Sequence, residues 1–287
     1  MSTDRPSIEA FGAELSARAR AFFSRLHIFR DLSRTCSFER LGEELDRRGV
    51  PWYDAIFALE EEFGGLVQKG THPRRPHLAL GLFQLVCLDL PRDEDEDGED
   101  DGVLAAGCWP VVHRRTTGEP LIHVGLYTPE GDIYIDESGR IYWHVVMLDR
   151  LEMLAGSARG FLERLALEDE VRLDFGDCAE TLVETDAALE IVSHRTMARV
   201  EEASDGVAEH WRGEGLFISR LPVPLSRRGP RTSHETRIFA RSPDDLLAAV
   251  RSSLEKDPDA KLRVDVYGPT GQKQRAALER AGIPLRR

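Results

Sequence analysis

Three strand-like segments separated by two very short turns constrain the fold of this chain more than any other feature. The segments are residues 121–127, 132–136 and 140–146, and the turns between them read TPEG and ESG. Strands joined by glycine-containing turns this short lie side by side and run in opposite directions. The sequence therefore predicts an antiparallel meander in this part of the chain.

Helices are predicted on both sides of the meander, because apolar residues recur there at helical spacing. Residues 38–48 are predicted to form one helix with Ser37 as its N-cap, and Pro51 to begin the next, since proline fits the first helical turn. Residues 157–167 follow the meander as another helix. The apolar series before the meander are Ile8, Phe11, Leu15, Phe22, Leu26 and Phe29, and then Trp52, Ile56, Leu59 and Phe63.

Helices, a central meander and a closing helix predict an α+β domain over residues 1–168. Within it, residues 78–90 are predicted as an apolar strand and residues 93–101 as an acidic, solvated loop. Residues 169–287 are predicted to form a second, smaller α+β unit. Its predicted elements are a helix over 187–203, a strand over 235–240, a helix over 244–254 capped by Ser242, a strand over 261–267 and a helix over 272–280.

The charge balance of the chain is acidic, with 51 Asp and Glu against 38 Lys and Arg and a formal net charge of −13. This charge disfavours binding to nucleic acid or to an anionic membrane surface and favours basic partners, but a role in solubility alone explains it at least as well. Cys36, Cys87, Cys108 and Cys178 show no CxxC spacing, so a zinc site is not predicted and a reducing compartment fits. We find no run of about 18 apolar residues and no signal-peptide pattern, which predicts a cytoplasmic protein outside the membrane.

Catalytic residues, cofactor sites and metal sites are not predicted. His113 and His123 stand on either side of a loop, which is not a metal-ligand spacing. Asp132 and Asp136 share one strand face, as paired carboxylates would. However, Asp136 opens a tight turn, where aspartate is favoured for its bond to the backbone. The sequence accordingly predicts a protein that is not an enzyme.

Aromatic residues gather in and around the predicted meander. Neighbouring residues of a strand point to opposite faces, so one of Tyr142 and Trp143 can be exposed, and exposed aromatics anchor protein interfaces. Core packing is the alternative for most of them. The predicted partner-binding residues are Trp109, Asp132, Tyr134, Asp136, Tyr142 and Trp143.

Two stretches carry a resemblance to a known family. Residues 47–68 (RRGVPWYDAIFALEEEFGGLVQ) contain a helix that runs into Phe63, Gly64 and Gly65, and residues 131–167 contain a strand, an acidic turn, a strand and a helix. In this order they resemble the SUKH superfamily over about residues 1–168. In the second stretch the matching positions are Asp136, Gly139, Arg140, Tyr142, Phe161 and Leu162.

The resemblance implies an α+β fold without enzymatic activity, in which the Phe-Gly-Gly turn, Gly139 and Arg140 are structural. Many members of the superfamily are thought to neutralise polymorphic toxins, often nucleases or deaminases, by binding them directly. The expected function is therefore that of a cytoplasmic bacterial immunity protein whose partner is a toxin domain. Two alternatives stay open: a regulatory or scaffold module with no toxin partner, and an effector or enzyme in residues 169–287 that the first domain controls.

Overall fold

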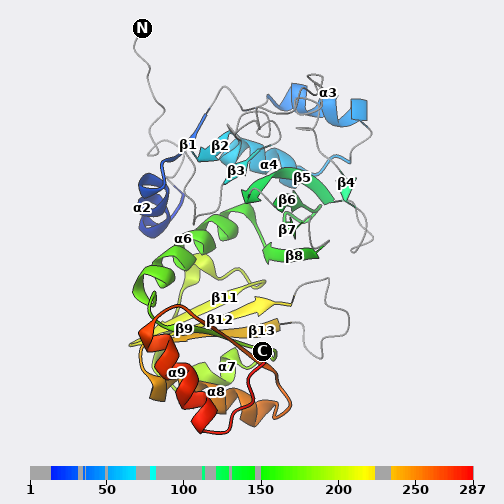
Figure 1. The fold of residues 1–287 in the computed structure, drawn as a ribbon. Coiled ribbons are helices and arrows are strands. Elements are labelled where there is room, and N and C mark those ends of the chain that lie inside the picture. The colour runs from blue at the N-terminus through cyan, green and yellow to red at the C-terminus, as the bar shows by residue number, and fades with distance from the viewer. Residues whose placement is uncertain are drawn as a thin grey trace, which may run out of the picture. The chain divides into compact units, whose positions relative to one another are not determined.

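The computed structural model describes residues 14–31, 35, 37–48, 51–68, 78–81, 112–113, 121–128, 131–145, 150–223 and 234–286. The chain is α+β and divides into two compact units (Figure 1). Unit 1 comprises Met1–Glu152 with Ser157–Arg159, and unit 2 comprises Met153–Gly156 with Gly160–Arg287.

Unit 1 combines helices with an antiparallel sheet. Its described helices are α2 (Ala17–Arg25), α3 (Phe38–Arg48) and α4 (Asp54–Phe63). Its described strands are β1 (Ile28–Arg30), β2 (Leu66–Gln68), β3 (Ala79–Leu80), β4 (Val112–His113), β5 (Leu121–Thr128), β6 (Gly131–Ile135), β7 (Ile141–Val145) and the first half of β8 (Arg150–Ala155), a strand that continues into unit 2. The sheet order is β1-β2-β3-β5-β6-β7-β8, and β4 also pairs with β5.

The predicted meander is confirmed as β5, β6 and β7, which pair in sequence order and antiparallel. In the β6–β7 register Tyr134 lies opposite Tyr142 and Ile133 opposite Trp143. The helix predicted over residues 38–48 is also confirmed, and the backbone N–H of Arg40 donates to Ser37 Oγ at its N-terminus. Local sequence signals were sufficient for these elements because short turns and caps act within a few residues.

Two helix predictions in unit 1 need correction. The first apolar series does not follow one helix, because α2 ends at Arg25 and His27 adopts a positive φ of 53° before strand β1 begins. The next helix begins at Asp54 rather than at Pro51, since Tyr53 still has extended backbone. Of the strand predicted over residues 78–90, only residues 78–81 are described. The acidic loop over 93–101 and Trp109 lie outside the described residues.

Unit 2 is built on a second antiparallel sheet, whose described strands follow the order β10-β11-β12-β13-β9-β14. They are β9 (Ala179–Val183), β10 (Met197–Arg199), β11 (Glu209–Gly213), β12 (Leu216–Pro222), β13 (His234–Ala240) and β14 (Leu262–Val266). The described helices are α6 (Ala158–Asp174), α7 (Ala188–Ser193), α8 (Pro243–Lys256) and α9 (Pro269–Arg280), with a 3₁₀ turn at Glu201–Ala203. Strands β13 and β14 both pair with β9, so α8 connects two strands that lie on either side of a third.

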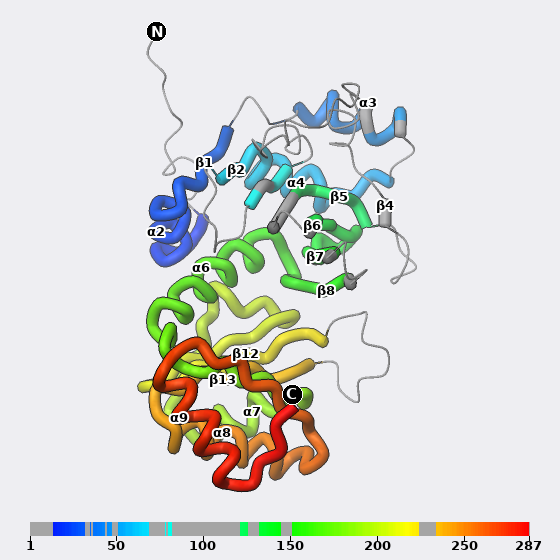
Figure 2. Tube along the Cα trace, in the orientation of Figure 1, coloured from blue at the N-terminus to red at the C-terminus, as the bar shows by residue number. Residues whose placement is uncertain are grey.

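Helices cover both faces of this sheet (Figures 1 and 2). Ile218 and Ile238 belong to the core that includes Leu246 of α8 and Leu278 of α9. Their strand neighbours point the other way: Phe217 and Phe239 pack in a separate core with Leu167 and Val171 of α6. The sheet is therefore the middle of three layers, with α6 on one side and α7, α8 and α9 on the other.

The division between the units lies at residues 153–160, not at 168. Helix α6 belongs mainly to unit 2, because Leu167 and Val171 are buried in that unit's core. The helix predicted over residues 187–203 is wrong beyond Ser193, since Met197–Arg199 pairs with β11 as a strand. The helix predicted over 244–254 is confirmed with its cap: Ser242 Oγ accepts from the backbone N–H of Asp245 at 3.0 Å.

Candidate functional site

The carboxylate of Asp136 organises the turn between β6 and β7. It accepts hydrogen bonds from the backbone N–H groups of Ser138 and Arg140, from Ser138 Oγ at 2.8 Å, from Arg140 Nε at 2.6 Å and from Tyr142 Oη at 3.0 Å. Burial acts to raise the pKa of Asp136, but the bonds from Ser138, Arg140 and Tyr142 outweigh it and lower this pKa below its ordinary value. Gly139 completes the turn with a φ of +85°.

The structure contradicts the prediction that Tyr134, Asp136 and Tyr142 bind a partner. Asp136 is only 1% exposed and both tyrosines are buried, so their side chains cannot reach another protein in this conformation. The Tyr134 ring lies edge-on to His123, with centroids 5.3 Å apart, and burial together with the charge of Asp132 raises the pKa of Tyr134. These residues pack within unit 1.

Asp132 and Trp143, the other described residues of the predicted site, are half-buried and lie on opposite faces of the meander. Asp132 Oδ1 lies 3.3 Å from His123 Nε2. The six predicted residues therefore do not form one surface, and a partner-binding role for Asp132 and Trp143 remains a prediction. Trp109 lies outside the described residues.

The Phe-Gly-Gly turn ends α4 and is held by an arginine from β1. The guanidinium of Arg30 donates to the carbonyls of Gly64 at 2.7 Å, Glu61 at 2.7 Å and Glu60 at 3.1 Å. The Glu61 and Gly64 carbonyls lie at the end of the helix, where helical donors run out, whereas the Glu60 carbonyl also accepts from the backbone N–H of Gly64 at 3.0 Å. Gly65 has a φ of +77°, and a Cβ there would lie 2.4 Å from the carbonyl oxygen of Asp31. The turn is accordingly structural.

An exposed cluster of aromatic rings, not predicted as a site, lies where α3 meets the start of α4. We define the aromatic surface as Phe38, Trp52 and Phe57. Trp52 is 56% exposed and Phe38 48%, while Phe57 is half-buried. The Phe57 ring contacts both others, with centroids 5.5 Å from Trp52 and 5.8 Å from Phe38.

Helix α3 fixes the position of the Trp52 ring. The indole Nε1–H donates to Asp46 Oδ1 at 2.6 Å, and a Cβ on Gly42 would lie 2.5 Å from Cη2 of the ring. Phe38, Gly42 and Asp46 are four residues apart, so they share one helix face. The sequence contained this spacing. The apolar stripe predicted for the following helix includes Trp52, and that prediction is wrong because α4 begins at Asp54, after Tyr53 in extended backbone.

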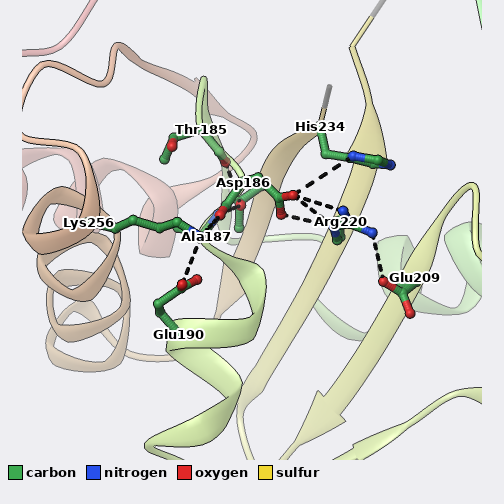
Figure 3. Close-up of polar contacts among 9 residues, drawn as sticks. Thr185, Asp186, Ala187, Glu190, Glu209, Arg220, His234 and Lys256 are labelled. Atoms are coloured by element: carbon green, nitrogen blue, oxygen red, sulfur yellow. Dashed lines mark hydrogen bonds and ion pairs between the residues drawn. The ribbon is translucent and has the colours of Figure 1, made fainter. Parts of the chain in front are cut away.

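A network of charged side chains surrounds the connection between β9 and α7 in unit 2 (Figure 3). Arg220 donates to both carboxylate oxygens of Asp186 and to Glu209 at 3.0 Å. Lys256 Nζ donates to the carbonyl of Asp186 and, at 2.7 Å, to Glu190. Burial and the charge of Arg220 lower the pKa of His234, whose ring lies 3.9 Å from Asp186. Opposite charges offset one another here, so the network holds the connection in place.

Among the described residues we find no group of three or more His, Cys, Asp or Glu side chains arranged to hold a metal ion. Across the same ranges, none of the helices is both long and apolar enough to cross a membrane. Cys178 is a buried free thiol.

Comparison with known proteins identifies no relative. No family model matches the chain, and no curated protein or solved structure matches it either. The resemblance to the SUKH superfamily consequently remains a prediction from the sequence motifs.

Proposed function

We propose that this chain is a non-enzymatic, protein-binding protein of the immunity type, which neutralises a toxin domain of the nuclease or deaminase class by binding it directly in the bacterial cytoplasm. The motifs in residues 47–68 and 131–167 support the immunity role through their resemblance to the SUKH superfamily. The aromatic surface on unit 1 supports a role in protein binding.

The observation that carries the proposal is the exposed and immobilised indole of Trp52. Leaving so much apolar area in water costs about 25 cal/mol for each Å², which a partner protein would recover on binding. The hydrogen bond to Asp46 and the contact over Gly42 hold the ring in one orientation, so little side-chain entropy remains to be lost. Large aromatics presented in this way are typical of interface hot spots.

The experiment begins by identifying a partner and then tests neutralisation. The full chain, as wild type and as Trp52→Ala, is used to capture proteins from a lysate of its own organism. A protein that only the wild type retains is identified by mass spectrometry. Its toxin domain is then expressed in host cells together with each version of the chain, and growth is measured.

We expect the wild type to restore growth and Trp52→Ala to weaken the complex by at least about thirtyfold, as for a hot-spot tryptophan. Leu189→Ala is the matched control, because this exposed leucine lies in unit 2. It should restore growth as the wild type does. A Trp52-dependent partner that contains no toxin domain would contradict the immunity role and favour a regulatory module. Equal capture by the wild type and Trp52→Ala would contradict the assignment of the surface.

A further inference from the structure

We propose that the aromatic surface of unit 1 receives a basic segment of the partner protein, with arginine or lysine side chains lying between the rings and the surrounding carboxylates. This inference rests on the proposed function and adds the chemistry of the partner to it. It is carried by the charges of the side chains that surround Phe38, Trp52 and Phe57.

Acidic residues dominate the exposed sides of α3 and α4. Among the side chains of these two helices that the structure describes, the exposed acidic ones are Glu39, Glu43, Asp46, Asp54 and Glu61, and the exposed basic ones are Arg40 and Arg47. Five negative charges against two positive ones leave an excess of three negative charges at pH 7. We call the five acidic residues the acidic rim.

Helix geometry places the acidic rim beside the rings. Phe38, Gly42 and Asp46 form the stripe of α3 that faces the aromatic surface. Glu39 directly follows Phe38 in the sequence, and Glu43 directly follows Gly42. On α4, Asp54 and Glu61 are three residues before and four residues after Phe57, so they lie on the same helix face as that ring. Asp46 contacts the Trp52 indole directly. A ligand on the rings would therefore lie within reach of several carboxylates.

Rim carboxylates other than Asp46, which accepts from the Trp52 indole, are available to a partner. Within the described residues, Glu39, Glu43 and Asp54 form no ion pair. A cation about 4 Å from such a carboxylate is stabilised by roughly 1 kcal/mol in bulk water. The stabilisation is larger where the bound partner excludes water from the surface. Rim charges of this kind mainly accelerate association and reject partners of the wrong sign.

The rings favour the same kind of ligand. A guanidinium or ammonium group within about 6 Å of a tryptophan face gains about 0.5–1 kcal/mol from the charge distribution of the ring. Arginine suits this site best, because its planar group can stack on a ring and donate two parallel hydrogen bonds to a carboxylate. The apolar stems of arginine and lysine would cover ring area that is now in water.

Unit 2 contains an aromatic side chain, Tyr267, that is about as exposed as Trp52 but is surrounded by different charges. Tyr267 is 60% exposed, and its hydroxyl donates to Glu180 at 3.0 Å. Glu180 in turn lies 3.0 Å from Arg237, and Asp265 is paired with Arg263. The acidic groups near this tyrosine are thus already neutralised by arginines, so an exposed ring alone does not provide the proposed site. Tyr267 serves as a control position.

The test measures binding of the full chain to two synthetic peptides by fluorescence anisotropy. In the basic peptide, arginines flank a row of leucines on a helix. The acidic peptide has glutamate in place of each arginine. The proteins are the wild type, Trp52→Ala, the charge-reversed pair Glu43→Lys with Glu61→Lys, and two controls. The controls are Tyr267→Ala and the pair Glu202→Lys with Glu255→Lys, which makes the same change in net charge on exposed residues of unit 2.

We expect the wild type to prefer the basic peptide, and Trp52→Ala and the Glu43/Glu61 pair each to weaken this binding by about tenfold or more. The two controls should change it by less than about threefold, and thermal melting confirms that each variant is folded. Equal loss in the Glu43/Glu61 and Glu202/Glu255 pairs would overturn the inference, because net charge alone would then explain the binding. Retention of the basic peptide by Trp52→Ala would also overturn it.

The outcome is separable from that of the proposed function. A toxin partner whose binding depends on Trp52 but not on Glu43 and Glu61 would leave the immunity role standing and refute the basic segment. Conversely, peptide binding with the expected pattern, together with a Trp52-dependent partner that has no toxin domain, would support the basic segment and refute the immunity role.

Discussion

The indole Nε1–H of Trp52 donates a hydrogen bond to Asp46 Oδ1 at 2.6 Å, which ties an exposed ring to the neighbouring helix α3. Trp52 precedes α4 and is 56% exposed, so the backbone of that helix does not position its ring. This pair of residues turns an exposed aromatic side chain into a fixed feature of the surface.

Removal of the Asp46 carboxylate should release the ring. We expect Asp46→Ala to sharpen the Trp52 signal in fluorine NMR of the fluorotryptophan-labelled chain, because a hydrogen bond worth about 1 kcal/mol is lost. Asp46→Asn is the matched control, since its amide oxygen can still accept the bond. An Asp46→Ala spectrum in which the Trp52 signal keeps its position and width would contradict this account.

Gly42→Ala should separate binding from stability. Alanine favours the helix by about 1 kcal/mol over glycine, but its Cβ would lie 2.5 Å from Cη2 of Trp52 and would displace the ring. We therefore expect an equal or higher free energy of unfolding in urea, together with weaker binding of the basic peptide. When Trp52 is already replaced by alanine, Gly42→Ala should have no further effect on binding. An additive loss in this double-mutant cycle would show that displacement of the ring does not cause the weaker binding of Gly42→Ala.

Asp136 should be among the residues most important for the stability of unit 1. Asp136→Ala removes a buried carboxylate that accepts bonds from Ser138, Arg140 and Tyr142, and we expect a loss of roughly 3–5 kcal/mol in the free energy of unfolding. Glu137→Ala, at the exposed neighbouring position of the same turn, should cost less than about 0.5 kcal/mol. Similar urea midpoints for the two variants would refute a structural role for Asp136.

Gly65 should tolerate a side chain less well than Gly139 does. Both have positive φ, so alanine at either position strains the backbone by about 1 kcal/mol or more. At Gly65 the added Cβ also meets the Asp31 carbonyl oxygen at 2.4 Å, whereas at Gly139 its nearest neighbour is Ala55 Cβ at 3.5 Å. The free energy of unfolding should therefore fall further for Gly65→Ala. The reverse order in denaturant unfolding would contradict the packing described around the Phe-Gly-Gly turn.

Unit 2 should lose stability in acid through Glu168. Burial acts to raise the pKa of Glu168, but the charges of Arg164 and Arg237 outweigh it and lower this pKa to about 2. Because the folded pKa lies below the ordinary value of 4.5, the stabilisation is present above about pH 4.5 and is lost as the pH falls towards 2. Its upper limit is about 3 kcal/mol.

Hydrogen exchange of the β13 amides between pH 5 and 3 would measure this loss in unit 2. Glu168→Gln should be less stable at pH 5 and should show a smaller change on acidification than the wild type. Parallel pH profiles for the two proteins would exclude Glu168 as the source.

Part of this fold could be predicted from the sequence because the signals were local. The turn at 137–139 specified the β6–β7 hairpin, and Ser242 with Asp245 specified the start of α8. Strands β9, β11 and β12 were missed, although Glu209–Gly213 and Leu216–Pro222 flank the two-residue turn Glu214-Gly215. Met197–Arg199 was assigned to a helix, and its pairing with β11 depends on residues more than ten positions away, which helical spacing does not report.

The candidate site was harder to predict than the fold. Aromatic residues of the meander were chosen as partner-binding, and Tyr134 and Tyr142 instead pack inside unit 1. Helical spacing assigns Trp52 to one apolar stripe with Ile56, Leu59 and Phe63. One short change of backbone, the extended conformation at Tyr53, moves the ring out of that stripe. Periodicity predicts which residues share a face only where the helix has already begun.

The most direct test of the central claim is photo-crosslinking from position 52 in cells of the source organism. A photoreactive tryptophan analogue, which keeps the indole N–H, replaces Trp52 in the full chain, and the same analogue at Leu189 in unit 2 is the control. The account predicts that position 52 crosslinks to one predominant protein, that this protein carries a toxin domain, and that position 189 does not crosslink to it. Crosslinks to the same set of proteins from both positions, or none from position 52, would contradict the claim that this surface binds a partner.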